Sequence, residues 1–344
     1  MGRAGLSNYF ISNEKIAVLG AGSWGMTLAI LLAERHNVKI WEFDKEQCEK
    51  LNKDRENKKF LPGIKIPDSI FISNNIEEVI SDSNIVFFAV PSHIVRSLAA
   101  RVKDLIKDKI IVNVAKGIDT DTLERLSEVI RKESNTDKVV VLSGPSHAEE
   151  VSRKIPTTVV ISAIKESNID LEYLQKVIMT DRFRVYTNDD IIGVELGGAL
   201  KNIIAIASGI SDGLGYGSNT KAALMTRGLA EIERLGIKLG AKRETFAGLT
   251  GMGDLITTCI SKFSRNRFVG EELGKGKKLK EILNNMIMVA EGVKTTLAAY
   301  KLSRKYEVVM PITEEVYKIL YEDKDAKESV TTLMLRSPKP ELWL

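Results

Sequence analysis

The chain has 344 residues, of which 44% are hydrophobic and 28% charged, with a formal net charge of +4. This composition indicates a globular protein long enough for two domains, and it excludes a disordered chain or a strongly basic nucleic-acid binder. The two cysteines, Cys48 and Cys259, are far apart, so we expect no disulfide framework, no metal site and a reducing, cytoplasmic setting. No apolar run approaches the roughly 20 residues of a membrane span.

Residues 1–14 show no periodic pattern and are predicted to form a loose N-terminal extension. Residues 15–190 alternate short β-rich runs with helical runs, which predicts a Rossmann-type, doubly wound α/β domain with a mostly parallel sheet. The expected strands are Ile16–Leu19, Val38–Phe43, Ile85–Val90, Ile110–Val114, Val139–Leu142, Thr157–Ile161 and Phe183–Tyr186. The expected helices among them are Trp24–Glu34, Ile94–Ile106 and Leu123–Lys132.

Residues 191–344 contain no β-rich runs, and amphipathic helical patterns replace them. This change predicts an all-α C-terminal domain that carries the substrate and the catalytic groups. The expected helices are Val194–Ser208, Lys221–Leu235, Leu255–Ile260, Phe268–Leu273, Val293–Tyr300 and Thr313–Leu320.

A glycine fingerprint follows the first expected strand, in the run Ile16–Gly25. Its three glycines have the GxGxxG spacing of dinucleotide-binding turns and are followed by a helical stretch. We expect Gly20 to make a tight turn, Gly22 to let a pyrophosphate approach the backbone, and Gly25 to let the helix pack closely on the strand. The helix N-terminus would then bind the phosphates.

The second expected strand leads to an acid, Glu42, about 20 residues beyond the fingerprint, where a carboxylate can bind the adenosine ribose hydroxyls. A carboxylate there would repel a 2′-phosphate, so the sequence favours NAD over NADP. Asp44 is a second candidate for the same role.

Three loops follow later strands at the edge where doubly wound sheets bind ligands: Val90–His93, Asn113–Gly117 and Ser143–Ala148. Lys116 could direct an ammonium toward a substrate or cofactor oxygen. The turn after Ser143 could cradle a polar substrate with its backbone N–H groups. His93 and His147 could act as bases, but we favour a role in ordering their loops.

The second half contributes a lysine in an apolar, glycine-lined helical run, Lys201, which we predict to be the proton-transfer group. Gly197 and Gly198 would allow close approach to a nicotinamide. The direction of the Lys201 pKa shift stays open, because desolvation and a nearby carboxylate act in opposite senses. Asp254 follows a glycine-rich turn, and Ser264–Arg267 opens another helix as a plausible phosphate receptor.

Taken together and in order, the motifs resemble NAD(P)-dependent glycerol-3-phosphate dehydrogenase of the bacterial type, over nearly everything after Glu14. One departure is Glu42-Phe43, where many bacterial members carry Arg or His after the second strand. The matching stretches are Gly20–Gly25, Phe60–Pro62, Val90–His93, Ala115–Gly117, Ser143–Ala148, Phe183–Tyr186, Ile192–Ile203, Ser211–Gly213, Thr226–Glu231, Gly251–Asp254, Ser264–Arg267, Val289–Gly292 and Met310–Glu315.

The resemblance implies a role for each matching residue. Catalytic roles would belong to Lys201, Lys116 and Asp254. Substrate contacts would come from Lys116, Gly144, Ser146, Lys201, Asp254, Ser264, Arg265 and Asn266. The dinucleotide would be lined by Gly20, Gly22, Ser23, Trp24, Gly25, Glu42, Phe43, Lys116, Ala148, Arg265, Val289 and Glu291.

The resemblance also implies the reaction. NADH would reduce dihydroxyacetone phosphate to sn-glycerol 3-phosphate while Lys201 protonates the alkoxide, with NADP(H) as a second possible cofactor. The resemblance further implies that the protein is a homodimer and that its product, sn-glycerol 3-phosphate, is a precursor of phospholipids. The alternatives are a related dehydrogenase acting on a hydroxy acid, a hydroxyacyl-CoA or a nucleotide sugar, and a non-catalytic NAD(H) sensor.

Overall fold

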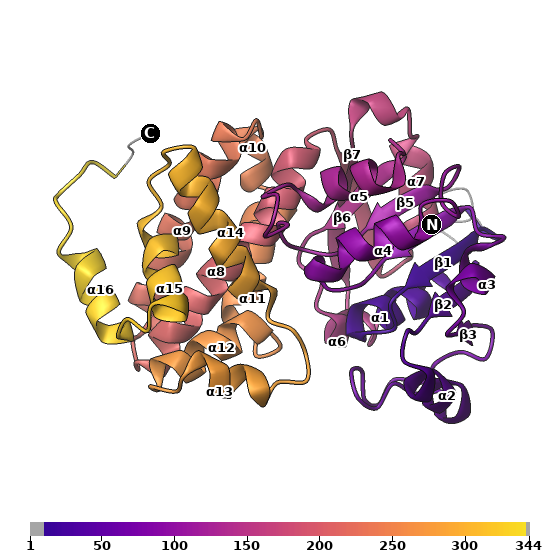
Figure 1. Cartoon of the computed structure of the whole chain (residues 1–344), viewed down its shortest axis with the longest axis horizontal. Helices are drawn as coiled ribbons and strands as arrows, with labels where there is room; N and C mark the ends of the chain where they lie inside the picture. The colour runs from indigo at the N-terminus through magenta and orange to yellow at the C-terminus, as the bar shows by residue number, and fades with distance from the viewer. Residues whose placement is uncertain (1–9, 342–344) are drawn as a thin grey trace, which may run out of the picture. The chain divides into compact units, whose positions relative to one another are not determined.

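A computed structural model describes residues 10–341, which fold as two compact units (Figure 1). The first unit comprises the described residues up to Ala115 together with Leu126–Ile191, and the second comprises Lys116–Arg125 and the residues from Ile192 onward. The segment Lys116–Arg125 thus belongs to the helical unit although it lies within the range 15–190 predicted for the first domain. We call this segment the arm.

The predicted N-terminal extension is attached to the first unit over its described part. The backbone N–H of Ile11 donates to the carbonyl of Lys176 at 3.1 Å, and that of Asn13 donates to the carbonyl of Arg35 at 2.8 Å. Residues 1–9 of the predicted extension lie outside the described residues.

The first unit is built on an eight-stranded sheet with the order β3-β2-β1-β4-β5-β6-β7-β8. All neighbouring strands pair in parallel except β6 and β7, so the sheet is mostly parallel as predicted. The order changes direction between β1 and β4, which is the switch point where doubly wound sheets bind ligands. The strands are β1 (Lys15–Leu19), β2 (Asn37–Trp41), β3 (Phe71–Ser73), β4 (Ile85–Phe88), β5 (Ile110–Asn113), β6 (Val139–Ser143), β7 (Thr157–Ala163) and β8 (Phe183–Asn188).

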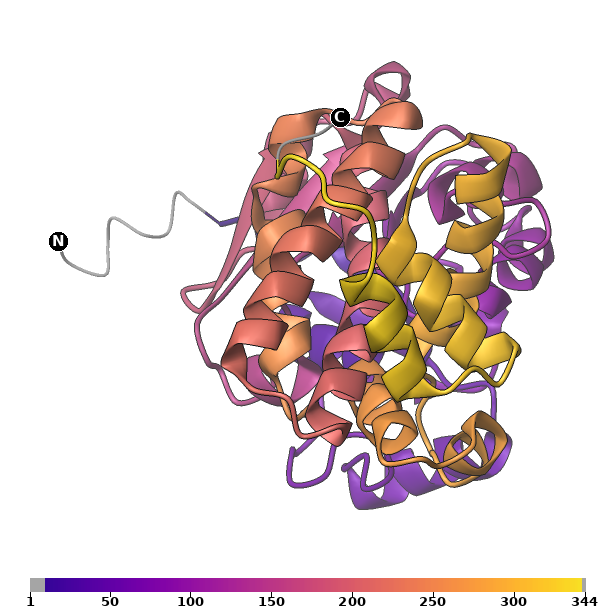
Figure 2. The same cartoon turned by 90° about the vertical axis from the view of Figure 1, so that its left-hand side faces the viewer.

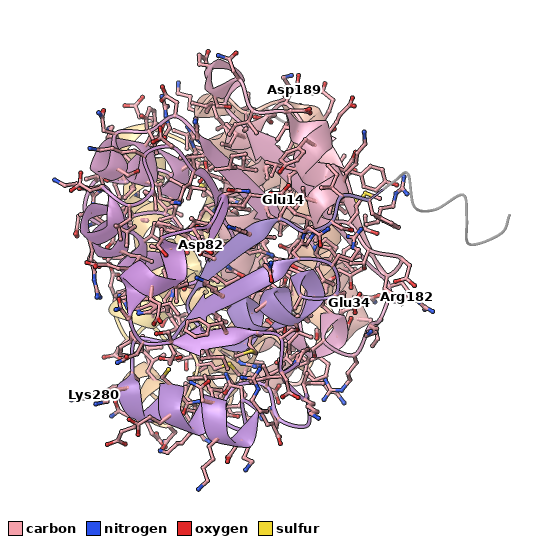
Figure 3. All side chains as sticks on the ribbon, turned by 90° about the vertical axis from the view of Figure 1, so that its right-hand side faces the viewer. Glu14, Glu34, Asp82, Arg182, Asp189 and Lys280 are labelled. Carbon is pink, nitrogen blue, oxygen red and sulfur yellow. The ribbon has the colours of Figure 1, made fainter. Side chains whose placement is uncertain are left out.

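Helices cover both faces of this sheet, because successive strand residues point to opposite faces and both sets are apolar. Ile16 and Val18 pack with α1 and α7 in one core, whereas Ala17 and Leu19 pack with α3, α4 and α5 in another. Charged side chains such as Glu34 and Asp82 lie on the outside of the unit (Figure 3). The helices are α1 (Ser23–Leu32), α2 (Lys45–Asp54), α3 (Ile76–Ile80), α4 (Val95–Val102), α5 (Leu126–Ser134), α6 (Ala148–Val151) and α7 (Leu171–Ile178).

Two features of the sheet were absent from the sequence prediction. Strand β3 has three residues at the sheet edge, too few for a recognisable alternation. Strand β7 runs antiparallel to β6, and residues 144–156, which include the four-residue helix α6, connect the two strands.

Apart from the arm, the regular elements of the second unit are helices over the described residues (Figure 2), and its hydrophobic core includes much of α8. Helix α8 is long and apolar enough to cross a membrane by length and composition, but 94% of its most apolar window is buried inside the unit. It is therefore the core helix of this unit. The helices are α8 (Ile191–Gly213), α9 (Ser218–Lys238), α10 (Arg243–Phe246), α11 (Asp254–Ile260), α12 (Arg265–Gly274), α13 (Leu279–Asn284), α14 (Glu291–Lys305), α15 (Pro311–Tyr321) and α16 (Ala326–Met334).

Helices α8 and α12 cross at backbone contact through two glycine pairs spaced four residues apart. A Cβ on Gly209 would lie 2.0 Å from the Arg267 carbonyl oxygen, and one on Gly213 would lie 2.2 Å from that of Glu271. From the other side, a Cβ on Gly270 would lie 2.0 Å from the Ile206 carbonyl oxygen. The crossing therefore holds the N-terminus of α12 at a set position along α8.

We expect Gly270→Ala to lower the free energy of unfolding by about 1–3 kcal/mol, because the backbones must separate to admit the methyl group. Urea denaturation followed by circular dichroism measures this loss. Gly217→Ala is the control for added volume, since a Cβ there meets nothing within 4 Å, and its loss should stay at about 0.5 kcal/mol, the cost of alanine at the N-cap of α9. Equal losses in the two variants would contradict the close crossing.

Candidate active site

The glycine fingerprint forms a turn between β1 and α1 with the features expected of a pyrophosphate cradle. Gly20 has φ +112°, and a Cβ there would meet the Ala89 carbonyl oxygen at 2.6 Å. A Cβ on Gly25 would lie 1.9 Å from the Gly20 carbonyl oxygen, whereas one on Gly22 would meet nothing within 4 Å. Gly20 and Gly25 are thus required by the fold, while Gly22 borders open space at the start of α1, where a phosphate can reach the helix N–H groups.

Two further contacts hold this turn. Asn57, which the sequence reading missed, is fully buried and donates from Nδ2 to the Ala21 carbonyl at 2.7 Å. The Thr27 hydroxyl donates to the Ser23 carbonyl at 2.8 Å, and the Ala148 carbonyl lies 3.4 Å from the same hydroxyl, which places the turn after β6 beside α1. Ser23 and Trp24 are the first residues of α1, and the Trp24 ring lies 6.5 Å from that of Phe183.

The two candidate acids after β2 have different surroundings. Asp44 caps α2 by accepting from the backbone N–H of Gln47 at 3.2 Å. Glu42 is buried, and its Oε1 accepts from the backbone N–H of Asp44 at 3.0 Å. Burial raises the pKa of the Glu42 carboxyl. The capping role therefore accounts for Asp44. The ring of the neighbouring Phe43 is exposed, as it must be for an adenine to stack on it.

The turn after β6 is compact. Gly144 has φ +133°, so a side chain there would be strained. The Ser146 hydroxyl donates to the Gly144 carbonyl at 3.0 Å, and Ala148 begins α6. The role of these residues in substrate or cofactor binding stays a prediction.

Within the second unit, three charged residues that are distant in the sequence form one buried cluster. Lys201 Nζ lies 2.8 Å from Asp254 Oδ1, and Lys116 Nζ lies 2.6 Å from Asp254 Oδ2. The Asp254 side chain is only 3% exposed and that of Lys201 7%. All three residues predicted to be catalytic thus meet at one carboxylate.

Thr258, a residue the sequence reading missed, completes the cluster. Its hydroxyl lies 2.6 Å from the Asp254 carbonyl oxygen, to which it donates, and 2.5 Å from Lys201 Nζ, from which it accepts. Among the described residues, Asp254 and Thr258 account for two of the three ammonium hydrogens of Lys201. The third is available for a substrate oxygen. The only sequence signal for Thr258 was its position four residues after Asp254, which places the two side chains on the same face of α11.

The surroundings settle the direction of the two pKa shifts. Burial lowers the pKa of Lys201 to about 8, although Asp254 acts in the opposite sense and Lys116 adds to the lowering. Burial alone would raise the pKa of the Asp254 carboxyl, but the ammonium groups of Lys116 and Lys201 overcome it and the net shift is downward. The cluster therefore holds an ionised carboxylate beside an amine that can gain or lose a proton near neutral pH.

A π-helical turn, Leu249–Gly253, places Asp254 at the start of α11. A Cβ on Gly251 would lie 2.1 Å from the Phe246 carbonyl oxygen, so the turn requires glycine there. A Cβ on Gly197 would lie 2.8 Å from the Thr250 carbonyl oxygen of the same turn. Gly197 thus has a packing role, since it lets the turn that carries Asp254 lie against α8. The expectation that Gly197 allows approach to a nicotinamide stays a prediction.

The arm brings Lys116 to the cluster and is anchored at several points of the second unit. Ile118 lies in the unit's core, and Arg125 at the far end pairs with Glu195 of α8 at 2.6 Å. A bridge between Ile118 and Arg125 closes the arm into a hairpin. Both charged side chains within the apolar part of α8, Glu195 and Lys201, thus have an ionic partner.

The N-terminus of α12 carries the predicted phosphate receptor. Ser264 caps the helix by accepting from the Arg267 N–H at 3.1 Å. Arg265 donates to the Phe263 carbonyl at 2.6 Å. Asn266 bridges α8 and α14, because its Nδ2 donates to Asn202 at 2.9 Å and its Oδ1 accepts from the Gly292 N–H at 2.8 Å. The bridge gives Asn266 a structural role beside the predicted substrate contact.

The remaining predicted cofactor residues of this unit lie at the start of α14. Val289 is 47% exposed, and Glu291 is the first residue of that helix. Among the described residues, no group of three or more His, Cys, Asp or Glu side chains could hold a metal ion.

Comparison with known proteins agrees with this geometry. The family NAD-dependent glycerol-3-phosphate dehydrogenase matches with its N-terminal part over residues 15–169 and with its C-terminal part over residues 190–331. The glycerol-3-phosphate dehydrogenase [NAD(P)+] of Thermoanaerobacter sp. is 53% identical over 95% of this chain and 99% of its own length, and that of Fusobacterium nucleatum is 50% identical over 95% and 98%.

The solved structures agree as well. The crystal structure of glycerol-3-phosphate dehydrogenase from Coxiella burnetii superposes with a TM-score of 0.89 at 37% identity, covering 94% of this chain and 99% of that one. The fold and the suspected family are thus confirmed, and the alternative readings are not favoured. The chain belongs to the NAD-dependent glycerol-3-phosphate dehydrogenase family.

Proposed function

We propose that the chain catalyses the reversible, NAD(P)H-dependent reduction of dihydroxyacetone phosphate to sn-glycerol 3-phosphate. The observation that carries the proposal is the buried cluster of Lys201, Asp254 and Lys116. A carbonyl that receives a hydride becomes an alkoxide and needs a proton at once, and the free hydrogen of the Lys201 ammonium can supply it.

Each member of the cluster has a distinct task in this proposal. Lys201 protonates the oxygen on C2 during reduction and removes that proton during oxidation. Asp254 holds both ammonium groups, and Thr258 fixes the direction of the Lys201 N–H bonds. Lys116 supplies positive charge where negative charge develops on the oxygen.

The phosphate of the substrate is assigned to the N-terminus of α12. The N–H groups of the first turn and the Arg265 guanidinium both favour a dianion. Binding energy from the phosphate would orient the reacting carbon without taking part in the chemistry.

The dinucleotide is assigned to the fingerprint turn of the first unit, whose open backbone at Gly22 fits a pyrophosphate. When bound, the nicotinamide supplies or accepts the hydride. Glu42 supports a preference for NAD(H), with NADP(H) as a weaker cofactor, because a carboxylate repels the 2′-phosphate. Family membership supports three finer proposals: the protein is cytoplasmic, it forms a homodimer, and its product is used as a phospholipid precursor.

Replacing Lys201 by Met should lower kcat for dihydroxyacetone phosphate reduction by about 10²–10⁴, the usual contribution of a general acid. The NADH dissociation constant, measured by fluorescence titration, should stay nearly unchanged. Retention of wild-type turnover in Lys201→Met would eliminate the proposed role.

The Lys201 pKa of about 8 predicts opposite pH profiles for the two directions. For glycerol 3-phosphate oxidation, kcat/KM should rise through this pKa because the neutral amine is the base. For reduction it should fall over the same range because the ammonium is the acid.

Two variants should move this inflection in opposite directions. Asp254→Asn removes the charge that raises the Lys201 pKa, so the inflection should shift to lower pH. Lys116→Met removes a charge that lowers it, so the inflection should shift to higher pH. Shifts of the same sign in both variants would show that another group controls the profile.

Glu42→Gln should raise kcat/KM for NADPH relative to NADH several-fold, because it removes the like charge facing a 2′-phosphate. Asp44→Asn is the matched control and should leave the ratio unchanged, since Asp44 caps α2. A change in the ratio in Asp44→Asn but not in Glu42→Gln would assign cofactor choice to Asp44.

A further inference from the structure

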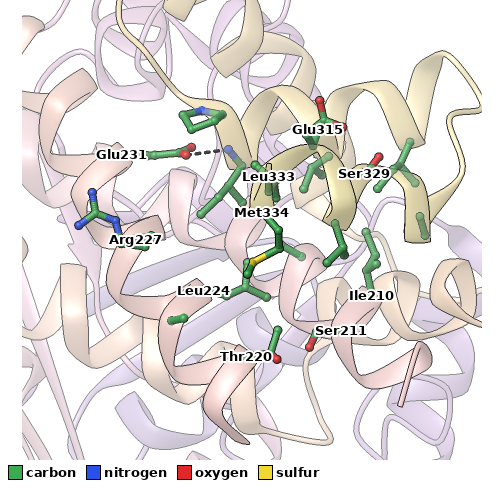
Figure 4. A pocket seen from close by; sticks show the side chains of 18 of the residues that line it. Ile210, Ser211, Thr220, Leu224, Arg227, Glu231, Glu315, Ser329, Leu333 and Met334 are labelled. Atoms are coloured by element: carbon green, nitrogen blue, oxygen red, sulfur yellow. Dashed lines mark hydrogen bonds between the residues drawn. The ribbon is translucent and has the colours of Figure 1, made fainter. Parts of the chain in front are cut away.

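The helical unit contains a cavity of about 230 Å³ that involves none of the residues assigned to the reaction. It lies between α8, α9, α15 and α16, and most of its wall is apolar. Figure 4 shows Leu224, Leu333, Met334 and Ile210 among the side chains around it.

The cavity follows one face of α9. Thr220, Leu224, Arg227, Glu231 and Arg234 all line it, a spacing of three, four or seven residues that puts them on one side of the helix. From the first to the last of these residues α9 rises by about 21 Å. The wall is therefore elongated, which fits a chain-like molecule better than a compact one.

Guanidinium groups gather at one part of this wall. Arg227, Arg234 and Arg336 all line the cavity, and Arg227 donates to the backbone carbonyl of Glu341, a neutral acceptor. Burial lowers the pKa of Arg234, the carboxylate of Glu231 raises it, and the smaller effects of the Arg227 and Arg336 charges lower it. Arg234 also donates from Nε to the backbone carbonyl of Val309 at 3.1 Å. Both Arg227 and Arg336 are thus close enough to act on Arg234, and an anion beside these cations would be stabilised by their charges.

The two carboxylates of the wall already have partners. Glu231 accepts from the backbone N–H groups of Ile312 and Thr313 at the start of α15, at 2.7 and 3.0 Å. Glu315 pairs with Lys318 and Lys324 at 3.0 and 2.6 Å. The wall carries three arginines against these two carboxylates, and two lysines pair with Glu315, so its charge is on balance positive.

A buried hydroxyl at the other part of the wall also indicates a ligand or water in the cavity. Ser211 is 2% exposed, lines the cavity beside Thr220 in Figure 4, and its Oγ has no hydrogen-bond partner among the described residues. Buried polar atoms in folded proteins nearly always have a partner, and a ligand or water inside the cavity can supply one here.

We propose that this cavity is a binding site for a single-chain anionic amphiphile, with the apolar chain along α9 and the anionic head group at Arg227, Arg234 and Arg336. The site is separate from the Lys201 cluster, so it does not depend on the proposed reaction. Three of the motif stretches supply part of its lining, namely Ser211–Gly213, Thr226–Glu231 and Met310–Glu315, but the sequence alone assigned them no binding site.

The probe for this proposal is decanoate, titrated into the full-length protein by isothermal calorimetry, with 1-decanol as the uncharged counterpart. Decanoate should bind saturably at one site per chain and more tightly than decanol. Ala223→Phe places bulk at a lining residue and should weaken decanoate binding by about tenfold or more, whereas Ala222→Phe, on a neighbouring residue outside the lining, should not. Both variants should keep wild-type turnover, which shows that they fold.

The head group is tested with Arg227→Ala, which should weaken decanoate about tenfold through the loss of a charge-assisted hydrogen bond. Arg243→Ala, on α10 and outside the lining, is the control. Absence of saturable binding, or equal binding in Ala223→Phe, overturns the site. Equal affinity for decanol overturns the assigned head group. A change of sedimentation in Ala223→Phe without decanoate binding would show that a second copy of the chain covers the cavity, and it also overturns the proposal.

Discussion

The site in the helical unit depends on the ion pairs that the buried carboxylate of Asp254 forms with Lys116 and Lys201. Removing a carboxylate and an ammonium from water is costly, and the attraction between them repays this cost only when the geometry is close. Here two ammonium groups approach one carboxylate, at 2.6 and 2.8 Å. Desolvation still prevails at Lys201, whose pKa falls to about 8, while attraction prevails at Asp254. The same balance stabilises the cluster and leaves its amine able to exchange a proton.

Such a cluster needs three pieces of backbone to converge, and glycines make this possible. Gly197 and Gly251 let the turn before Asp254 lie against α8 and α10, where a methyl group would collide with backbone oxygens. The glycine pairs between α8 and α12 do the same for the helix that carries Ser264 and Arg265. The arm is held by Ile118 in the core and by the Arg125–Glu195 pair, so Lys116 reaches the carboxylate from a separate part of the chain.

Much of the architecture was predictable because it depends on local patterns. The alternation of β-rich and helical runs predicted seven of the strands, and the change of pattern near residue 190 predicted the helical half. The fingerprint glycines were readable because their spacing carries the turn geometry with it. The short strand β3 was missed, since three residues are too few to show an alternation. Strand β7 was predicted, but its antiparallel direction was not, since direction depends on the path of the connection through space.

The sequence by itself determined the fold class, the family and the residues that carry the proposed chemistry, because these depend on residue type at short spacing. Tertiary structure alone decided what depends on distance between remote residues. It showed that Thr258 and Asp254 together orient Lys201, that Asn57 supports the fingerprint turn, and that the arm belongs to the helical unit. It also decided the sign of the Lys201 pKa shift, since desolvation depends on everything packed around the amine and not on its neighbours in the sequence.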